Sequence, residues 1–291
     1  MLSATTPNFL TVENLLNVLD QNAFVGIAAC GATLVIIGGG FDLSVGAIYA
    51  LAGAVAAWVT VEADPLLGLL AGATIGPVLG VLNGALVAGV GIHSFLATLA
   101  TALAFSGLAV AVTDGFLIDA SDSTTFVWLG REELVPEIPN PVLLFALVAA
   151  SLGLLLSRTR LGRYIYAVGG NIEAARLSGV RVGLVTASTF LISGFAAAVA
   201  GLVEVSKSGT GQASPGGTTT LPLDAIAAVV IGGTSIKGGQ GAVWRTVLGV
   251  LLLALITNAF NILNVEPQYR DIFSAAIIIA AVAVNSVAAR R

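Results

Sequence analysis

The sequence has 291 residues, of which 57% are hydrophobic and 10% are charged, whereas about 25% of residues are charged in ordinary soluble domains. A soluble core cannot absorb that much apolar surface, and the net charge of −4 argues against binding to nucleic acid. The composition therefore predicts a protein that is embedded in membrane lipid.

Charge-free runs predict how the chain crosses the membrane. A helix needs about 20 apolar residues to span a bilayer, and the runs do not alternate apolar and polar residues as the strands of a membrane barrel do. We predict an all-α, polytopic helical membrane protein that forms a single transmembrane domain over residues 1–291. The nine predicted segments are 18–37, 43–61, 66–89, 95–113, 140–157, 183–204, 223–236, 246–264 and 271–288. The segment 223–236 is short for a full span, which predicts a broken or re-entrant helix.

Residues 38–46, GGGFDLSVG, form a glycine-rich break with one charge between the first two predicted spans. Asp42 suits an N-cap, because its carboxylate can accept N–H bonds near Ser44 and its charge meets the positive end of the next helix. Two interpretations stay open: a capped turn at the membrane surface, or a broken helix at depth that lines a polar path. On the second interpretation Asp42 and Ser44, with Asn83 in the third segment, are candidates for the translocation path.

Glycines recur every fourth residue through the third segment. They are Gly68, Gly72, Gly76, Gly80 and Gly84. Small residues at this spacing form a groove that lets another helix backbone approach closely. The pattern favours packing within the chain, and a subunit or repeat interface is the alternative.

Two loops of opposite charge orient the chain. The loop 114–139 carries six acids and only Arg131, whereas 158–182 carries five of the twelve basic residues. Because basic residues prefer the cytoplasm, we predict that 158–182 is cytoplasmic and 114–139 extracytoplasmic. Arg290 and Arg291 predict a cytoplasmic C-terminus. Counting back through five segments puts the N-terminus outside, which is unusual without a signal sequence and indicates either a miscounted segment or a missing helix.

Within the cytoplasmic loop, the residues predict a short helix over 172–178. Gly169 and Gly170 break the chain before it, and Asn171 is a suitable N-cap. Glu173 lies in the first turn, where the helix dipole favours a negative charge, and Gly179 is a natural stop. A loop without a partner and a stiff handle for a soluble protein both fit this pattern.

The sequence predicts no catalytic, metal or cofactor site. IGGTSIKGGQG at 231–241 is not a phosphate loop, because Lys237 lacks the preceding glycine and the following Ser or Thr. The single Cys30 and single His93 cannot form a Cys/His metal site. Asn258 and Asn261 lie three apart on one face of an apolar helix, either as a buried hydrogen-bonded pair or as part of a solute path.

Three segments carry a resemblance to a known family. GGGFDLSVGAIYALAG at 38–53, GRYIYAVGGNIEAARLSGVRV at 162–182 and IGGTSIKGGQGAV at 231–243 resemble the signature segments of the ribose-type family of ABC importer permeases, in the same order. The resemblance covers nearly the whole chain, from about Phe9 onward. Relatives typically have one further hydrophobic helix before the segment that matches Asn8 to Thr11, so we expect either a start site placed too late or a permease with nine spans.

The resemblance implies the ABC importer permease fold and a set of partners. These are a second permease subunit in a homodimer or heterodimer, two cytoplasmic ABC ATPase subunits that hydrolyse the ATP, and an extracytoplasmic solute-binding protein. In the family, the short cytoplasmic helix docks in a groove of the ATPase. The residues that match this coupling segment are Arg163, Gly170, Asn171, Glu173, Ala174, Ala175, Arg176 and Gly179.

The implied function is import of a sugar or sugar-like solute by alternating access, with the permease itself not an enzyme. Two other transporter classes remain as alternatives: an ABC permease for branched-chain amino acids or nucleosides, and an ion-coupled secondary transporter. The latter would need intramembrane carboxylates, which are almost absent. An intramembrane enzyme would need a catalytic set, which the sequence lacks. The solute itself is not readable from these residues.

Overall fold

The computed structural model describes residues 11–212, 220–263, 265–266, 272–273 and 275–276. Among these residues, seven helices are long and apolar enough to cross a membrane. They are α2 (Val12–Ile37), α3 (Val45–Glu62), α4 (Pro65–Gly84) with its π-helical continuation η1 (Ala85–Val90), α5 (Ser94–Thr113), α7 (Asn140–Arg158), α10 (Val182–Ser208) and α12 (Val243–Ile262). The prediction of a helical, multi-pass membrane fold is confirmed.

The predicted count of nine spans agrees less closely with the structure than the fold class does, because the described residues contain seven long apolar helices. In the place of segment 223–236 lies α11 (Leu221–Ile231), which has 11 residues and so rises about 16 Å, roughly half of the hydrocarbon core of a bilayer. It is therefore too short to span the bilayer, as predicted, and most of its residues are buried. The last predicted segment, 271–288, lies almost entirely outside the described residues, and Arg290 and Arg291 lie outside them altogether.

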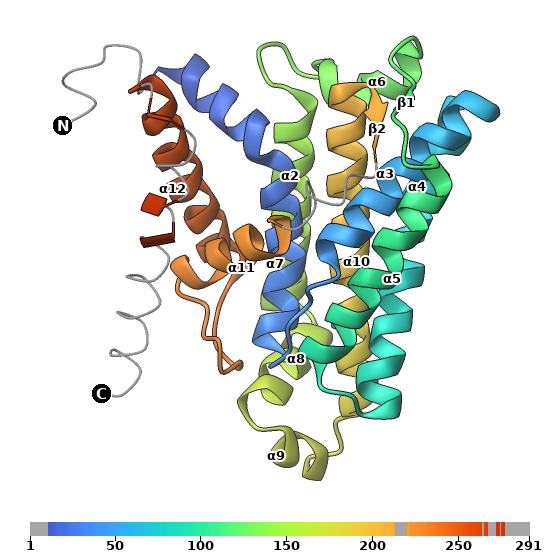
Figure 1. Ribbon diagram of the computed structural model, residues 1–291. Helices are drawn as coiled ribbons and strands as arrows, with labels where there is room; N and C mark the ends of the chain where they lie inside the picture. Colours follow the sequence, from blue (N-terminus) through green and yellow to red (C-terminus); the bar gives the residue numbers. More distant parts are fainter. Residues whose placement is uncertain (1–10, 213–219, 264, 267–271, 274, 277–291) are drawn as a thin grey trace.

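The short elements gather at the two ends of the helical bundle (Figure 1). One end holds α6 (Thr124–Arg131) and a small antiparallel pair, β1 (Ile118–Asp119) with β2 (Thr210–Gly211). The other end holds α8 (Arg160–Gly170) and α9 (Ile172–Leu177). The acidic loop 114–139 and the basic loop 158–182 thus lie at opposite ends, as a membrane crossing between them requires.

The prediction that Gly169 and Gly170 break the chain is wrong. Helix α8 runs through both glycines, and the break comes at Asn171, whose φ of −159° is extended. Neither glycine has a positive φ. Gly169 serves a close contact instead, because a Cβ there would overlap the backbone carbonyl of Ile37. The next helix, α9, ends one residue before the predicted boundary.

The glycine ridge of α4 packs within the chain. All five ridge glycines are buried. A Cβ on Gly72 would approach the Ala52 carbonyl of α3 at 2.7 Å, and Cβ atoms on Gly76 and Gly80 would overlap carbonyls of α10. The α10 side contributes its own small residue, since Gly194 meets Gly76 backbone to backbone. Close backbone approach of this kind supports helix association where lipid removes the hydrophobic driving force.

Helices α2 and α10 form the centre of the bundle. In α2, 72% of an apolar 18-residue stretch is buried, whereas the corresponding share in the span formed by α4 and η1 is 22%. Helix α2 packs on α7, α10, α11 and α12, and α10 packs on α3 and α4 as well. The polar features described next lie where the chain between α2 and α3 meets α4, α5 and α10.

Candidate functional site

The break between α2 and α3 carries a buried carboxylate. Asp42 is 3% exposed, and its Oδ1 accepts hydrogen bonds from the backbone N–H of Ser44 at 3.0 Å and from the Ser44 hydroxyl at 2.6 Å. Its Oδ2 accepts from the hydroxyl of Ser193 on α10 at 2.8 Å. The N-cap of α3 is Ser44 and not the predicted Asp42; the carboxylate instead holds Ser44 in place and ties the start of α3 to α10.

Asn83 extends the cluster to α4 and α5. Its Nδ2 donates to the Ser44 hydroxyl oxygen at 2.7 Å, and its Oδ1 accepts from the Thr101 hydroxyl at 2.7 Å. We call Asp42, Ser44, Asn83, Thr101 and Ser193 the buried polar network. The first three are predicted candidates. Sequence reasoning missed Thr101 and Ser193, because a single hydroxyl in an apolar helix has no pattern that distinguishes it.

Hydroxyl groups of α5 satisfy the extended backbone of the break. The N–H of Phe41 donates to Ser94 Oγ at 3.1 Å, and the N–H of Leu43 donates to Thr98 Oγ1 at 3.0 Å. An unsatisfied backbone group at membrane depth costs several kcal/mol, so irregular chain persists there only against such partners. In Figure 1 this segment rises from the α8 end into the bundle before α3 begins. The structure therefore favours a broken helix within the protein over a capped surface turn.

The two asparagines of α12 lie elsewhere. Asn258 exchanges hydrogen bonds with Asn14 at the start of α2, with donor to acceptor distances of 3.1 and 3.3 Å. Asn261 is exposed on the last turn of α12. Asn258 thus lies beside the start of α2, whereas the buried polar network follows the other end of that helix. Their role in a solute path stays a prediction.

The predicted coupling residues are held on two short helices. Asn171 caps α9, because its Oδ1 accepts the N–H of Ala174 at 2.9 Å, and Gly179 ends the turn after it with a φ of +80°. Only Ala175 of α9 is buried. Glu173 and Arg176 form an ion pair at 2.9 Å with both side chains more than half exposed, so the pair contributes little stability.

Other residues of this region are exposed. Arg163 is exposed on α8, as are Gly170 at its end and Ala174 on α9. Two apolar side chains of α9 are exposed as well: Ile172 at 47% and Leu177 at 89%. Sequence reasoning did not single out these two, although an apolar residue at the polar end of a membrane protein is a signal for a partner.

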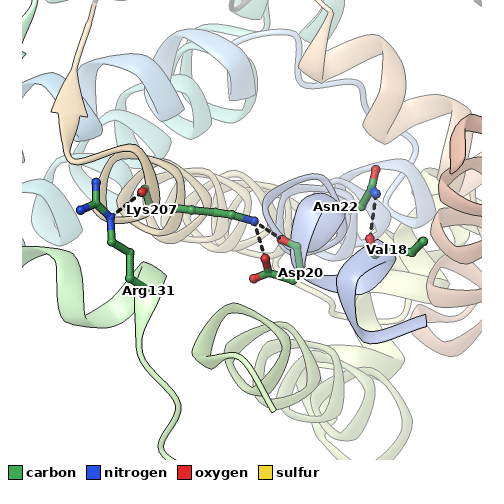
Figure 2. Close-up of polar contacts among 5 residues, drawn as sticks. All are labelled: Val18, Asp20, Asn22, Arg131 and Lys207. Carbon is green, nitrogen blue, oxygen red and sulfur yellow. Dashed lines mark hydrogen bonds and ion pairs between the residues drawn. The ribbon is translucent and has the colours of Figure 1, made fainter. Parts of the chain in front are cut away.

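At the opposite end, three elements are tied together by basic side chains (Figure 2). Arg131 of α6 donates to the carbonyls of Lys207 and Ser208 at 2.9 and 2.8 Å, which satisfies the C-terminal end of α10. The Lys207 Nζ in turn donates to Asp20 Oδ2 on α2 at 2.5 Å. The loop 114–139 is thus anchored to the two central helices.

Comparison with known proteins identifies the chain's relatives. Residues 14–282 match the family described as branched-chain amino acid transport system / permease component. The ribose import permease of Escherichia coli (strain K12) is 38% identical over 98% of this chain and 89% of its own length. The ribose import permease of Bacillus subtilis (strain 168) is 39% identical over 97% and 87%. The D-allose transport permease of E. coli is 37% identical over 95% and 84%. No solved structure matches the chain.

These matches confirm the resemblance that the three signature segments carry. They span nearly the whole chain, at an identity that is about the same for each relative. The helical, membrane-crossing fold agrees with them. The chain is a multi-pass membrane protein and belongs to the ribose-type family of ABC importer permeases.

Proposed function

We propose that this chain is the membrane-spanning subunit of an ATP-driven importer for a sugar or a sugar-like solute. The observation that carries the proposal is the identity of 37 to 39% to permeases named for ribose and D-allose over nearly the full chain. The family's description names branched-chain amino acids instead, but these individual relatives favour the sugar class.

The orientation follows from charge. The end that holds α8 and α9 carries Arg158, Arg160, Arg163, Arg176 and Arg181, and basic residues near membrane helices prefer the cytoplasm. In this orientation the acidic loop 114–139 and the contacts of Arg131 with the end of α10 face the outside, where a solute-binding protein delivers its cargo. The C-terminus is cytoplasmic by the same rule, from Arg290 and Arg291.

Helix α9 is the proposed contact with a cytoplasmic ATPase. The helix is capped at Asn171 and stopped at Gly179, so it can bear force as a rigid unit. Its apolar side chain at Leu177 is 89% exposed, and burying a leucine side chain is worth roughly 1.5 to 3 kcal/mol. A groove on an ATPase would provide that burial, while the hydrolysis itself takes place on the ATPase.

The buried polar network supports alternating access as a positioning element. It fixes the broken helix between α2 and α3 to α4 and α10 through side chains, and joins α4 to α5. Such a segment can shift as a unit between two arrangements when the helices around it move. A second copy of this chain, or a related permease, would provide the other half of the pathway.

The test is co-purification followed by transport. The permease is purified in mild detergent from the membranes of its source cells, and the proteins bound to it are identified by mass spectrometry. The complex is then placed in proteoliposomes with ATP inside or outside, and uptake of radiolabelled ribose, D-allose and leucine is measured. We expect an ATPase in the complex and ATP-dependent sugar uptake. Leucine uptake, or sugar uptake driven by an ion gradient without ATP, would refute the proposal.

A further inference from the structure

The three signature segments, far apart in the sequence, meet at one point. The point lies at the end of α2, where Gly39 follows the helix, and it includes Gly169 of α8 and the turn with Gly238 and Gly239 between α11 and α12. The N–H of Gly239 donates to the backbone carbonyl of Ile37 at 2.8 Å. The segments therefore touch backbone to backbone, and we call Gly39, Gly169, Gly238 and Gly239 the glycine joint.

No side chain fits inside the glycine joint. A Cβ on Gly169 would overlap the Ile37 carbonyl and approach the nitrogen of Gly239 at 2.7 Å. A Cβ on Gly238 would lie 2.8 Å from the Gly169 carbonyl oxygen and 3.0 Å from the Gly39 Cα. Gly39, Gly238 and Gly239 also have left-handed φ values of 85, 83 and 72°, which glycine adopts without strain. The available space therefore requires glycine at positions 169, 238 and 239, and the backbone geometry requires it at positions 39, 238 and 239.

The turn between α11 and α12 is itself stiff. Within it the N–H of Ser235 donates to the Gln240 carbonyl, and the N–H of Gly238 donates to the Ser235 carbonyl, both at 3.0 Å. The Tyr166 hydroxyl of α8 donates to the Gly241 carbonyl at 2.7 Å. Burial raises the pKa of the Tyr166 phenol, so the hydroxyl keeps its proton and remains a donor. The second half of the turn is thus held to α8, at Gly241 by the Tyr166 hydroxyl and at Gly238 and Gly239 by the contact with Gly169.

Helix α9 has few other routes into the bundle. It packs on α8 and on the start of α10. A cavity of about 590 Å³ lies beside it, lined by Ile172 and Arg176 of α9 and also by Val87 of η1 and by His93, which precedes α5. A hollow cannot transmit a push, because force passes through packed atoms. Apart from the route through α10, the connection from α9 toward α2 therefore runs through α8 and the glycine joint.

We propose that the glycine joint transmits movement of α9 to the broken helix after α2 and to the turn between α11 and α12. Gly39 continues directly into the segment that the buried polar network holds, so a displacement of α8 reaches Asp42 over three residues of chain. The backbone hydrogen bond from Gly239 carries the same displacement into α11 and α12. This inference rests on the proposed function, because it takes α9 to be the contact with an ATPase.

The test compares Gly169→Ala with Gly107→Ala in the reconstituted permease–ATPase complex. A Cβ on Gly107 of α5 meets nothing within 4 Å, so this variant controls for a glycine-to-alanine change in a helix. The amount of bound ATPase, the rate of ATP hydrolysis and the ATP-dependent uptake of radiolabelled ribose or D-allose are measured in the same vesicles. We expect Gly169→Ala to keep its ATPase and hydrolysis while uptake per ATP falls about tenfold. Gly107→Ala should match the wild type.

The outcomes separate this inference from the proposed function. If the wild type shows no ATP-dependent uptake, the proposed function fails first. If the wild type transports and Gly169→Ala has a normal ratio of uptake to hydrolysis, or loses its ATPase, the joint does not transmit. Should Gly169→Ala fail to insert, Tyr166→Phe decides: it removes the hydroxyl bond to Gly241 without adding volume. A lowered ratio in Tyr166→Phe supports transmission, and a wild-type ratio overturns it.

Discussion

Asp42→Ala tests whether the buried polar network holds the break between α2 and α3. The substitution removes the acceptor of three hydrogen bonds, two from Ser44 and one from Ser193. Asp42→Asn is the matched variant, because the amide oxygen can still accept both bonds from Ser44 and its NH₂ can donate to the Ser193 oxygen. The pair therefore separates loss of the hydrogen bonds from loss of the negative charge.

The magnitude follows from the number of donors left without a partner. Each buried group that loses its partner costs about 1 to 3 kcal/mol. The Ser193 hydroxyl can turn to a carbonyl of its own helix, which leaves the Ser44 N–H and hydroxyl as the main losses. We expect Asp42→Ala to lower the free energy of unfolding by about 2 to 4 kcal/mol, and Asp42→Asn by about 1 kcal/mol or less.

Thermal unfolding in detergent, followed by tryptophan fluorescence, measures this difference. Trp58 lies on α3, the helix that follows the break, and contributes to the signal together with Trp128 and Trp244. A change of 1 kcal/mol corresponds to roughly 2 to 4 °C in Tm for chains of this size, so Asp42→Ala should melt at least several degrees below Asp42→Asn. Equal melting temperatures for the two variants would show that the hydrogen bonds to the carboxylate do not stabilise the break.

Three further predictions concern the glycine ridge of α4, the ion pair of Lys207 with Asp20, and helix α9. Gly76→Ala should lower the melting temperature by several degrees, because its Cβ would overlap the α10 backbone, whereas Gly107→Ala, with nothing within 4 Å, should not; equal values would refute the packing argument. Lys207→Met should destabilise the fold by about 1 to 3 kcal/mol by removing the partner of a half-buried carboxylate on α2, measured by the same melting assay. The double reversal Glu173→Arg with Arg176→Glu keeps the ion pair within α9. We expect it to lose ATPase co-purification at an unchanged melting temperature, which would show an effect on the partner surface alone. Unchanged ATPase binding would exclude recognition of these charges by the ATPase.

The sequence predicted correctly those features that a short stretch of neighbouring residues determines without ambiguity. Runs of about 20 apolar residues require membrane helices, so the seven long helices were predicted from the sequence, with boundaries within three residues except at the start of α2 and the end of α10. Local caps were equally readable, because Asn171 before Glu173 and a glycine stop at Gly179 satisfy a short helix whatever surrounds it. The charge difference between loops 114–139 and 158–182 also placed them at opposite ends.

Local rules failed where one residue type has two uses. Glycine permits a turn and it permits close contact, and the sequence alone could not tell that Gly169 serves the second use within a continuous helix. Lone hydroxyls posed the same problem, because a hydroxyl can bond to a carbonyl of its own helix, and nothing in the sequence tells that Thr101 and Ser193 also bond to other elements. The two asparagines of α12 share a helix face, yet Asn258 bonds to Asn14, more than 200 positions away in the chain.

The sequence by itself determined which segments lie in the membrane, which lie in the loops at its two sides, and the order of the elements. Hydropathy, caps and charge are properties of neighbouring residues. Tertiary structure alone decided which polar atoms meet. The buried polar network joins residues 42, 44, 83, 101 and 193, and the glycine joint brings residues 39, 169, 238 and 239 together. Such contacts form only when helices from the whole chain pack, since each partner satisfies a hydrogen bond or a space that no neighbour in sequence can reach.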